Sequence, residues 1–232
     1  MAAYNQGRHL SRCLDSLRDQ TMPSTDYEVI VVDDGSSDET PEILKERGSD
    51  LRVLTLPANR GLPAACNAGL DVANAAYVMR VDSDDWIEPD ALLPQRNVLD
   101  AQPEIDIVVT DHWRVTEAGR VRRSPDPGNV FTWIATGCMM RKARVEEAGG
   151  YRPLYWEEYD LYLRMLERGA TLVRLEQPVL SYRAHDESMT ARESARLGGW
   201  RELLDAWPLE TLRRWGRDDE MERVVGEELT AL

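Results

Sequence analysis

Hydrophobic positions along this chain alternate between helical and strand-like spacing. Leu10, Cys13, Leu14 and Leu17 recur every three or four residues, which predicts an amphipathic helix over 8–20. Residues 27–32 form a β-branched apolar run instead, as expected for a parallel strand buried on both faces. The same signals predict further strands at 51–56, 77–81, 105–110, 171–175 and 179–183, and further helices at 41–47, 63–75, 90–99, 142–147 and 158–167. Such alternation predicts an α/β fold with a mixed, mostly parallel sheet flanked by helices.

Two segments depart from this alternation. Residues 114–131 are charged and rich in Pro and Gly, which predicts a loop or an irregular hairpin. Residues 191–229 are acidic and helical in pattern. Their apolar stripe, which we interpret as a packing surface, consists of Leu203, Leu204, Trp207 and Leu212.

Acidic residues follow two of the predicted strands. Asp33 and Asp34 close the first, and Asp82, Asp84 and Asp85 close another. The carboxyl ends of strands in an open α/β sheet meet at the edge where ligands bind. Side chains alternate along a strand, so Asp82 and Asp84 can point the same way, and they repel unless a cation lies between them.

Oxygen ligands of this kind suit Mg²⁺ or Mn²⁺. The alternative is a solvated acidic turn. An EF-hand fits poorly, because its glycine and glutamate positions, counted from Asp82, hold Ile87 and Leu93.

Composition limits the classes of function. The chain has 232 residues, 42% hydrophobic and 30% charged, which suits one globular domain. Its net charge of −14 argues against binding nucleic acid through a basic face. Cys13, Cys66 and Cys138 are too widely spaced for a zinc motif and predict free thiols in a reducing cytoplasm. The sequence has no apolar run approaching the ~20 residues of a membrane span.

An ordered set of motifs resembles family 2 glycosyltransferases. The matching segments are Tyr4-Asn5, Val31-Val32-Asp33-Asp34-Gly35-Ser36, Asn59-Arg60-Gly61, Asn67-Ala68-Gly69, Asp82-Ser83-Asp84-Asp85, Gly149-Gly150-Tyr151, Glu157-Glu158-Tyr159-Asp160-Leu161 and the run from Tyr182 to Thr190. The resemblance implies a GT-A fold and transfer of a sugar, with inversion, from a nucleoside-diphosphate sugar bound through Mg²⁺ or Mn²⁺. It also implies a role in bacterial polysaccharide or glycoconjugate assembly. We expect a UDP-sugar donor, a saccharide or lipid-linked acceptor, and a cytoplasmic location, peripheral at the inner face of the membrane.

The resemblance also implies a division of the chain and a role for each site residue. It assigns 1–190 to the GT-A domain, with 1–111 as its nucleotide-binding half and 112–190 as its acceptor half, and 191–232 to a helical extension. The expected nucleotide contacts are Tyr4, Asp33, Asp34, Asn67 and Asp82. The expected metal ligands are Asp84, Asp82 and His185, and the expected acceptor contacts are Trp133, Gly137, Trp156 and Asp160.

The expected general base is Glu158, which stands where the family has an aspartate. Glu157 and Asp160 remain alternatives, and acids in the first turn of a helix can also simply offset its dipole. Cys66 replaces a family arginine that contacts the nucleotide, and Arg60 or Arg80 could supply that cation instead. His9 and His112 have no motif around them and are interpreted as structural or exposed.

The amino end departs from the family pattern. Family members begin with an apolar strand that lies between the strands ending at Val32 and Val81, whereas only Met1-Ala2-Ala3 precedes Tyr4 here. We therefore expect the gene product to begin upstream with a Val/Ile-rich segment, and without it two sheet edges to face a gap. A truncated fragment or an inactive nucleotide-sugar-binding protein is the alternative function. A sugar nucleotidyltransferase would need a basic Gly-rich loop, which Asp34-Gly35-Ser36-Ser37 is not.

Overall fold

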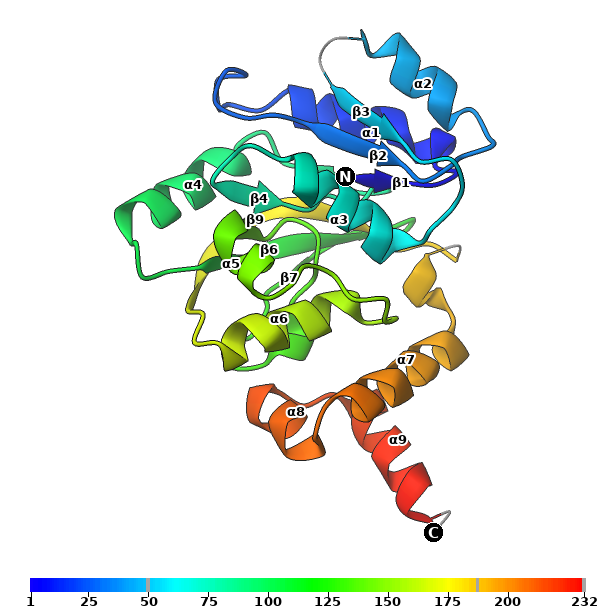
Figure 1. Cartoon of the computed structure of the whole chain (residues 1–232), viewed down its shortest axis with the longest axis vertical. Coiled ribbons are helices and arrows are strands. Elements are labelled where there is room, and N and C mark those ends of the chain that lie inside the picture. The colour runs from blue at the N-terminus through cyan, green and yellow to red at the C-terminus, as the bar shows by residue number, and fades with distance from the viewer. Residues whose placement is uncertain (49–50, 187, 231–232) are drawn as a thin grey trace.

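The computed structural model describes residues 1–48, 51–186 and 188–230, and it has two sheets flanked by helices (Figure 1). The α/β architecture predicted from the sequence is confirmed. Each helix predicted up to residue 167 is present, with ends shifted by a few residues. These helices are α1 (Gly7–Arg18), α2 (Thr40–Glu46), α3 (Leu62–Val72), α4 (Leu92–Ala101), α5 (Lys142–Glu147) and α6 (Glu157–Glu167).

The first sheet is parallel, with the strand order β1-β2-β3. Its strands are β1 (Ala2–Ala3), β2 (Ile30–Asp33) and β3 (Arg52–Thr55). The buried face of α1 consists of the predicted stripe Leu10, Cys13, Leu14 and Leu17. In this register Ala3 lies beside Asp33, so Tyr4 and the acids after β2 emerge at the same sheet edge.

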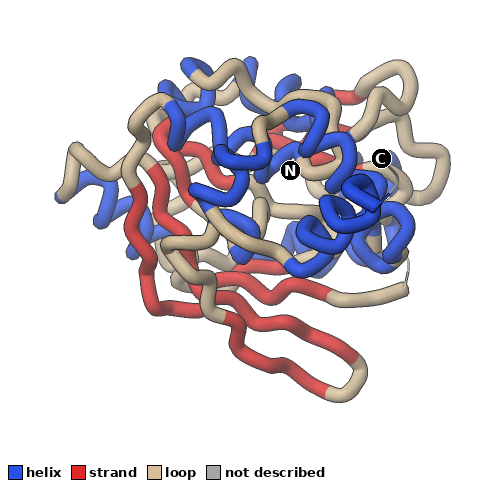
Figure 2. The backbone as a smooth tube through the Cα atoms, turned by 90° about the horizontal axis from the view of Figure 1, so that it is seen from below, coloured by secondary structure: helices blue, strands red, loops and turns tan. Residues whose placement is uncertain are grey.

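The second sheet is mixed, with the order β4-β8-β6-β9-β5, and β7 pairs with β6. Its strands are β4 (Tyr77–Met79), β5 (Trp86–Ile87), β6 (Ile107–Thr116), β7 (Gly119–Arg123), β8 (Met139–Arg141) and β9 (Leu172–Arg183). The hairpin of β6 and β7 projects beyond the helices, so the hairpin alternative for 114–131 is confirmed in part (Figure 2). The two strands predicted at 171–175 and 179–183 are one strand, whose register shifts near Pro178. The sequence interpretation missed β5 and β8 because each is only two or three residues long.

A cavity of about 320 Å³ lies between the two sheets and is lined by residues of both. Its lining is mostly apolar and includes Val32 from β2, Val78 from β4 and Ala65 from α3. The first strand was expected to be absent. It is present but only two residues long, and it pairs with β2 through Ala2 and Ala3. In the strand pairing of the described residues, β4 bonds to β8 and not to β1, so the expected gap between the sheets is present.

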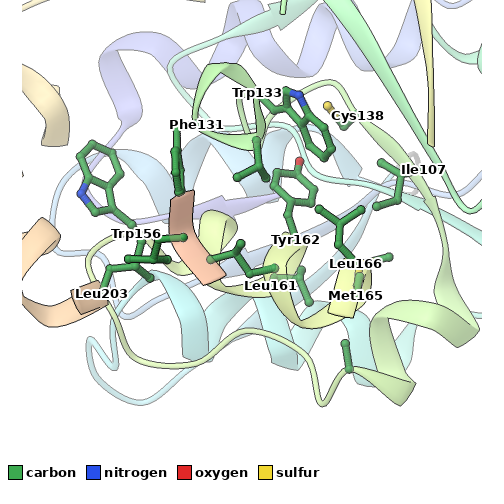
Figure 3. Close-up of a cluster of buried hydrophobic side chains, with 14 of the residues drawn as sticks. Ile107, Phe131, Trp133, Cys138, Trp156, Leu161, Tyr162, Met165, Leu166 and Leu203 are labelled. Atoms are coloured by element: carbon green, nitrogen blue, oxygen red, sulfur yellow. The ribbon is translucent and has the colours of Figure 1, made fainter. Parts of the chain in front are cut away.

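An aromatic core lies between the second sheet and the carboxyl-terminal helices. Figure 3 shows Trp133, Tyr162 and Trp156 in this core together with aliphatic side chains of α6. The last helices are α7 (Glu193–Ala206), α8 (Leu209–Trp215) and α9 (Asp219–Thr230), and short 3₁₀ turns cover Val130–Thr132 and Met189–Ala191. Leu203 and Leu212 are buried in the core and Leu204 and Trp207 pack against it, which confirms the stripe as a packing surface.

The cysteines and the helix lengths agree with the sequence interpretation. Cys13, Cys66 and Cys138 are free thiols. Among the helices of the described residues, none has the length and apolarity required to cross a bilayer.

Candidate active site

The loop that follows β4 brings an aspartate to a histidine far away in the sequence. The Asp84 Oδ2 atom lies 3.1 Å from His185 Nε2, although the two residues are 101 positions apart. Pairing of β5 with β9 brings the two segments together, since Trp86 lies beside Ser181. Arg183 strengthens this link by donating from its Nε to the carbonyl oxygen of Asp84 at 3.1 Å. The sheet therefore places Asp84 and His185, two predicted metal ligands, within hydrogen-bond distance of one another.

Asp85 holds this loop in place. Its side chain is 1% exposed, and its Oδ1 accepts the backbone N–H of Arg183 at 2.8 Å. Burial, followed by the charges of Asp84 and Asp82, raises the pKa of Asp85 well above its ordinary value. Through this hydrogen bond, the buried Asp85 ties the loop to β9 just before His185. The contact gives Asp85 a structural role in holding the loop.

His9 is a neighbour that the sequence interpretation missed. Its ring centroid lies 5.4 Å from that of His185, with the ring planes inclined at 54°. Burial, followed by the charges of Arg183 and His185, lowers the pKa of His9, so a neutral imidazole is favoured there. Its position near the start of α1 was the available signal, because that helix begins at the edge where the acidic loops lie.

Asp82 is bound by an arginine on both oxygens. Arg80 donates from Nε to Asp82 Oδ1 at 2.6 Å and from a terminal nitrogen to Oδ2 at 3.0 Å. The other terminal nitrogen of Arg80 donates to Glu157 Oε1 at 2.7 Å. Arg80 is 9% exposed and Glu157 is 1% exposed, so the bridge between them is buried. Arg80, which the sequence analysis offered as a cation for the nucleotide, thus binds two protein carboxylates in this structure.

Glu158 stands next to this bridge at the start of α6. Its Oε2 atom is buried and has no hydrogen-bond partner among the described residues. Burial raises the pKa of Glu158 to about 8, with a further contribution from the neighbouring charge of Glu157. Burial also raises the pKa of Glu157, although the charge and hydrogen bond of Arg80 counter part of that effect. A carboxyl group with a pKa near neutrality and a free oxygen has the properties of a general base.

The predicted nucleotide contacts at β2 shape the loops around them. Asp34 Oδ1 and Oδ2 accept the backbone N–H groups of Arg60 and Gly61 at 2.8 and 2.9 Å. Asp33 accepts the N–H of Ser36 at 3.0 Å. Gly35, with a φ of +74°, allows close approach, since a Cβ there would lie 2.7 Å from the carbonyl carbon of Ala58. Both acids are buried and hold the loops around them, with both oxygens of Asp34 and one oxygen of Asp33 accepting backbone N–H groups.

Tyr4 and Asn67 have contrasting environments. Tyr4 is 43% exposed at the sheet edge, and its ring is free to stack on a base. The Asn67 side chain instead donates to the carbonyl oxygen of Tyr151 and accepts its N–H, both at 2.8 Å. Asn67 thereby joins α3 to the segment preceding α6.

Two of the predicted acceptor contacts lie in the core. Trp133 is 1% exposed and donates from Nε1 to Asp126, so it has no face to offer to a sugar. Asp160 is fully buried, with bonds to Arg152, Arg164 and Trp207. These two assignments are corrected, because α6 turns Asp160 into the core and Trp133 packs against Tyr162 on the buried face of that helix. Asp160 is likewise withdrawn as the alternative base.

The other two predicted acceptor contacts lie closer to the acids. Trp156, the residue just before α6, is 6% exposed. Its ring stacks on that of Tyr159, with 5.1 Å between the ring centroids. Gly137 donates its N–H to the carbonyl oxygen of Arg80 at 2.8 Å and has a φ of +85°. Gly137 thus lies directly beside the Arg80 bridge.

The residues at the loop fit a divalent cation that also binds ligand oxygens. Within the described ranges, no three His, Cys, Asp or Glu side chains are grouped as a complete metal cage. Mg²⁺ at phosphate sites needs only one or two carboxylates, and an imidazole also suits Mn²⁺. Asp84 and His185 supply one carboxylate and one imidazole of these kinds, 3.1 Å apart.

Comparison with known sequences gives the family. The family described as glycosyl transferase family 2 matches residues 1–161. The amylovoran biosynthesis glycosyltransferase AmsE of Erwinia amylovora is 29% identical over 216 residues, which cover 86% of this chain and 79% of AmsE. The poly(ribitol-phosphate) β-glucosyltransferase of Bacillus spizizenii is 44% identical over 94 residues, which cover 39% of this chain and 15% of that protein. The chain therefore spans most of one relative and a small part of the other.

Solved structures share the fold at low sequence identity. Staphylococcus aureus TarS 1–349 in complex with UDP-GlcNAc has a TM-score of 0.72 at 19% identity, covering 99% of this chain and 71% of that one. The mannosyltransferase PcManGT of Pyrobaculum calidifontis, in complex with GDP-Man and Mn²⁺, has a TM-score of 0.71 at 18% identity, covering 98% and 67%. These similarities confirm the expected GT-A fold. The family match over residues 1–161 establishes that the chain belongs to glycosyl transferase family 2.

Proposed function

We propose that the chain transfers a sugar, with inversion, from a nucleoside-diphosphate sugar to an acceptor hydroxyl in a metal-dependent reaction. The observation that carries this proposal is that one site contains both a pair of residues suited to a cation and a carboxyl group suited to act as a general base. The Asp84–His185 pair suits a cation on a diphosphate, and Glu158 suits a general base. Arg80 links the two regions through Asp82 and Glu157.

Asp84 and His185 would hold Mg²⁺ or Mn²⁺, with Asp82 beside them. A bound divalent ion neutralises a phosphate leaving group as a Lewis acid does. The chain needs such neutralisation, since its net charge is −14 and the loop after β4 is acidic. The Mn²⁺ in the complex of PcManGT supports this part of the proposal.

Glu158 would take the proton of the acceptor hydroxyl as that oxygen attacks the anomeric carbon. With a pKa of about 8, its carboxyl is mostly protonated at pH 7 in the chain without substrate. Its desolvation makes the deprotonated form a stronger base than a carboxylate in water. Glu157 does not serve in this role because Arg80 holds its Oε1.

The exposed ring of Tyr4 would stack on the base of the nucleotide, while Asp33 and Asp34 maintain the loops around it. We propose a UDP-sugar as the donor, supported by the UDP-GlcNAc and UDP complexes of TarS. The acceptor would be a saccharide or a lipid-linked saccharide in polysaccharide assembly, supported by the relative named for amylovoran biosynthesis. In this proposal residues 1–111 bind the nucleotide and residues 112–190 bind the acceptor.

The test is nucleotide release from a panel of UDP-, GDP- and dTDP-sugars with Mn²⁺ and mixed saccharide acceptors. We expect release from at least one donor that depends on the acceptor, and its loss in Asp84→Asn. Binding of a nucleotide sugar without release in any combination would favour an inactive binding protein instead.

A further inference from the structure

Arg80 joins two carboxylates that belong to opposite sides of the proposed reaction. It holds both oxygens of Asp82, on the loop of the predicted metal ligands, and one oxygen of Glu157, 77 residues later. We infer that Arg80 is a positioning residue, which fixes the acidic loop and the first turn of α6 relative to one another. This inference rests on the proposed function, since that turn carries Glu158 as the base.

The backbone around Arg80 is held independently of its side chain. Its carbonyl oxygen accepts the N–H of Gly137 at 2.8 Å, and its backbone forms a bridge with Thr136. The Thr136 hydroxyl accepts the N–H of Asp82 at 3.2 Å. The backbone at the start of the loop is therefore anchored, and from it the Arg80 guanidinium reaches across to α6.

The shape of the guanidinium is what permits the double contact. Its nitrogens form a planar fork, so one edge can hold a carboxylate on two atoms while another nitrogen serves a second partner. Arg80 uses Nε and one terminal nitrogen for Asp82 and the other terminal nitrogen for Glu157. Lysine keeps the positive charge as a single point and cannot reproduce this geometry. Arg80→Lys therefore separates the effect of position from the effect of charge.

Arg174 provides a matched control. Its Nε donates to Asp111 Oδ1 at 2.8 Å, and Asp111 is fully buried, as Glu157 nearly is. Asp111 also bonds Arg122 and Ser124 of the β6–β7 region, away from the Asp84–His185 pair. Arg174→Lys thus disturbs a partly buried arginine–carboxylate contact that has no part in the proposed site.

The experiment measures kcat, donor KM and the calorimetric affinity for the nucleotide with Mn²⁺ in both lysine variants. We expect Arg80→Lys to lower kcat about 10- to 100-fold, as small misplacements of reacting groups do. Nucleotide affinity should fall less than kcat, because Gly137 and Thr136 still hold the backbone of the loop, whereas the base acts only after binding. Arg174→Lys should lower the melting temperature but keep kcat within about twofold. Equal kcat in the two variants, at equal loss of stability, would overturn the inference.

A double-mutant cycle with Glu157→Gln tests whether Arg80 affects Glu158 through Glu157. If Arg80 acts on the base through Glu157, the kcat losses of Arg80→Lys and Glu157→Gln should not multiply in the double variant. Measurement at pH 9, above the wild-type Glu158 pKa of about 8, limits the effect of its ionisation on the comparison, and circular dichroism verifies folding. Losses that multiply would contradict the inference. A wild-type chain without transfer from any donor would overturn the proposed function and this inference together, whereas transfer with an unaffected Arg80→Lys overturns the inference alone.

Discussion

Two acids on the first turn of α6 have opposite environments. Asp160 is fully buried and bonded to Arg152, Arg164 and Trp207, and these partners lower its pKa despite the effect of burial. Glu158, two residues earlier, has a buried oxygen without a partner in the described structure and a pKa raised to about 8. A satisfied carboxylate anchors the helix, whereas an unsatisfied one retains the capacity to accept a proton. Burial alone therefore does not distinguish structural acids from reactive ones, but partners do.

The largest expected effect separates these two acids by activity. Glu158→Gln removes the proton acceptor and keeps the shape, so kcat should fall by about 10²–10⁴-fold. Nucleotide affinity should persist, because the base acts on the acceptor and not on the bound donor. Steady-state transfer assays and calorimetry of nucleotide binding measure the two quantities. Wild-type turnover in this variant, with loss in Asp160→Asn, would show that the base is misassigned.

The second effect separates them by stability. Asp160→Ala leaves Arg164 buried at 7% exposure without its carboxylate partner. Removing one partner of a buried ion pair costs about 3–5 kcal/mol of unfolding free energy. Denaturant unfolding measures this loss, and we expect the smaller cost from Glu158→Gln, whose Oε2 has no partner to lose. A larger loss of stability in Glu158→Gln than in Asp160→Ala would reverse the comparison.

Metal removal tests the other side of the site. A diphosphate near Asp82 and Asp84 is repelled unless a cation is present. We expect nucleotide affinity to fall at least several-fold in EDTA, and Asp84→Asn to show a comparable loss in the presence of Mn²⁺. Titration calorimetry with and without EDTA provides the comparison. Equal affinity in both conditions would remove the cation from the mechanism.

The smallest effect concerns pH. A base must be deprotonated to act, so kcat/KM should rise with pH up to the Glu158 pKa of about 8. The groups that set this pKa include Glu157, which raises it, and Arg80, which lowers it. Glu157→Gln removes a like charge, so the rising limb should move to lower pH. The pH profiles of the wild type and of this variant measure the shift, and a shift to higher pH would contradict the assignment.

The same two acids predict opposite effects of pH on stability. Glu158 has a folded pKa above its ordinary value of 4.5, so its protonated form favours folding. That contribution is lost as pH rises from about 4.5 through about 8. Asp160 has a folded pKa below its ordinary value of 3.8, so its contribution is present at neutral pH and lost as pH falls through that lowered pKa. Unfolding curves of Glu158→Gln and Asp160→Asn against pH should show these opposite slopes relative to the wild type.

Sequence reasoning worked for features that depend on neighbouring residues. The apolar spacing of α1, the β-branched run of β2 and the acids at the ends of β2 and β4 are all local patterns, and the structure contains each of them. It failed for Trp133 and Asp160, because a motif position does not state whether a side chain points to solvent or into a core. It also missed β5 and β8, which are too short to show a periodicity.

The sequence by itself determined the α/β class, the order of elements and the presence of an acidic sheet edge, since each follows from local periodicity and the geometry of strands. Only the tertiary structure decided which of these acids are available. Asp84 meets His185 because β5 pairs with β9, and Glu157 on α6 is paired because Arg80 reaches it from the end of β4. The pKa of Glu158 depends on burial by segments far away in the chain. Burial and charge pairing are sums over spatial neighbours, and such neighbours are distant in sequence, so no local pattern encodes them.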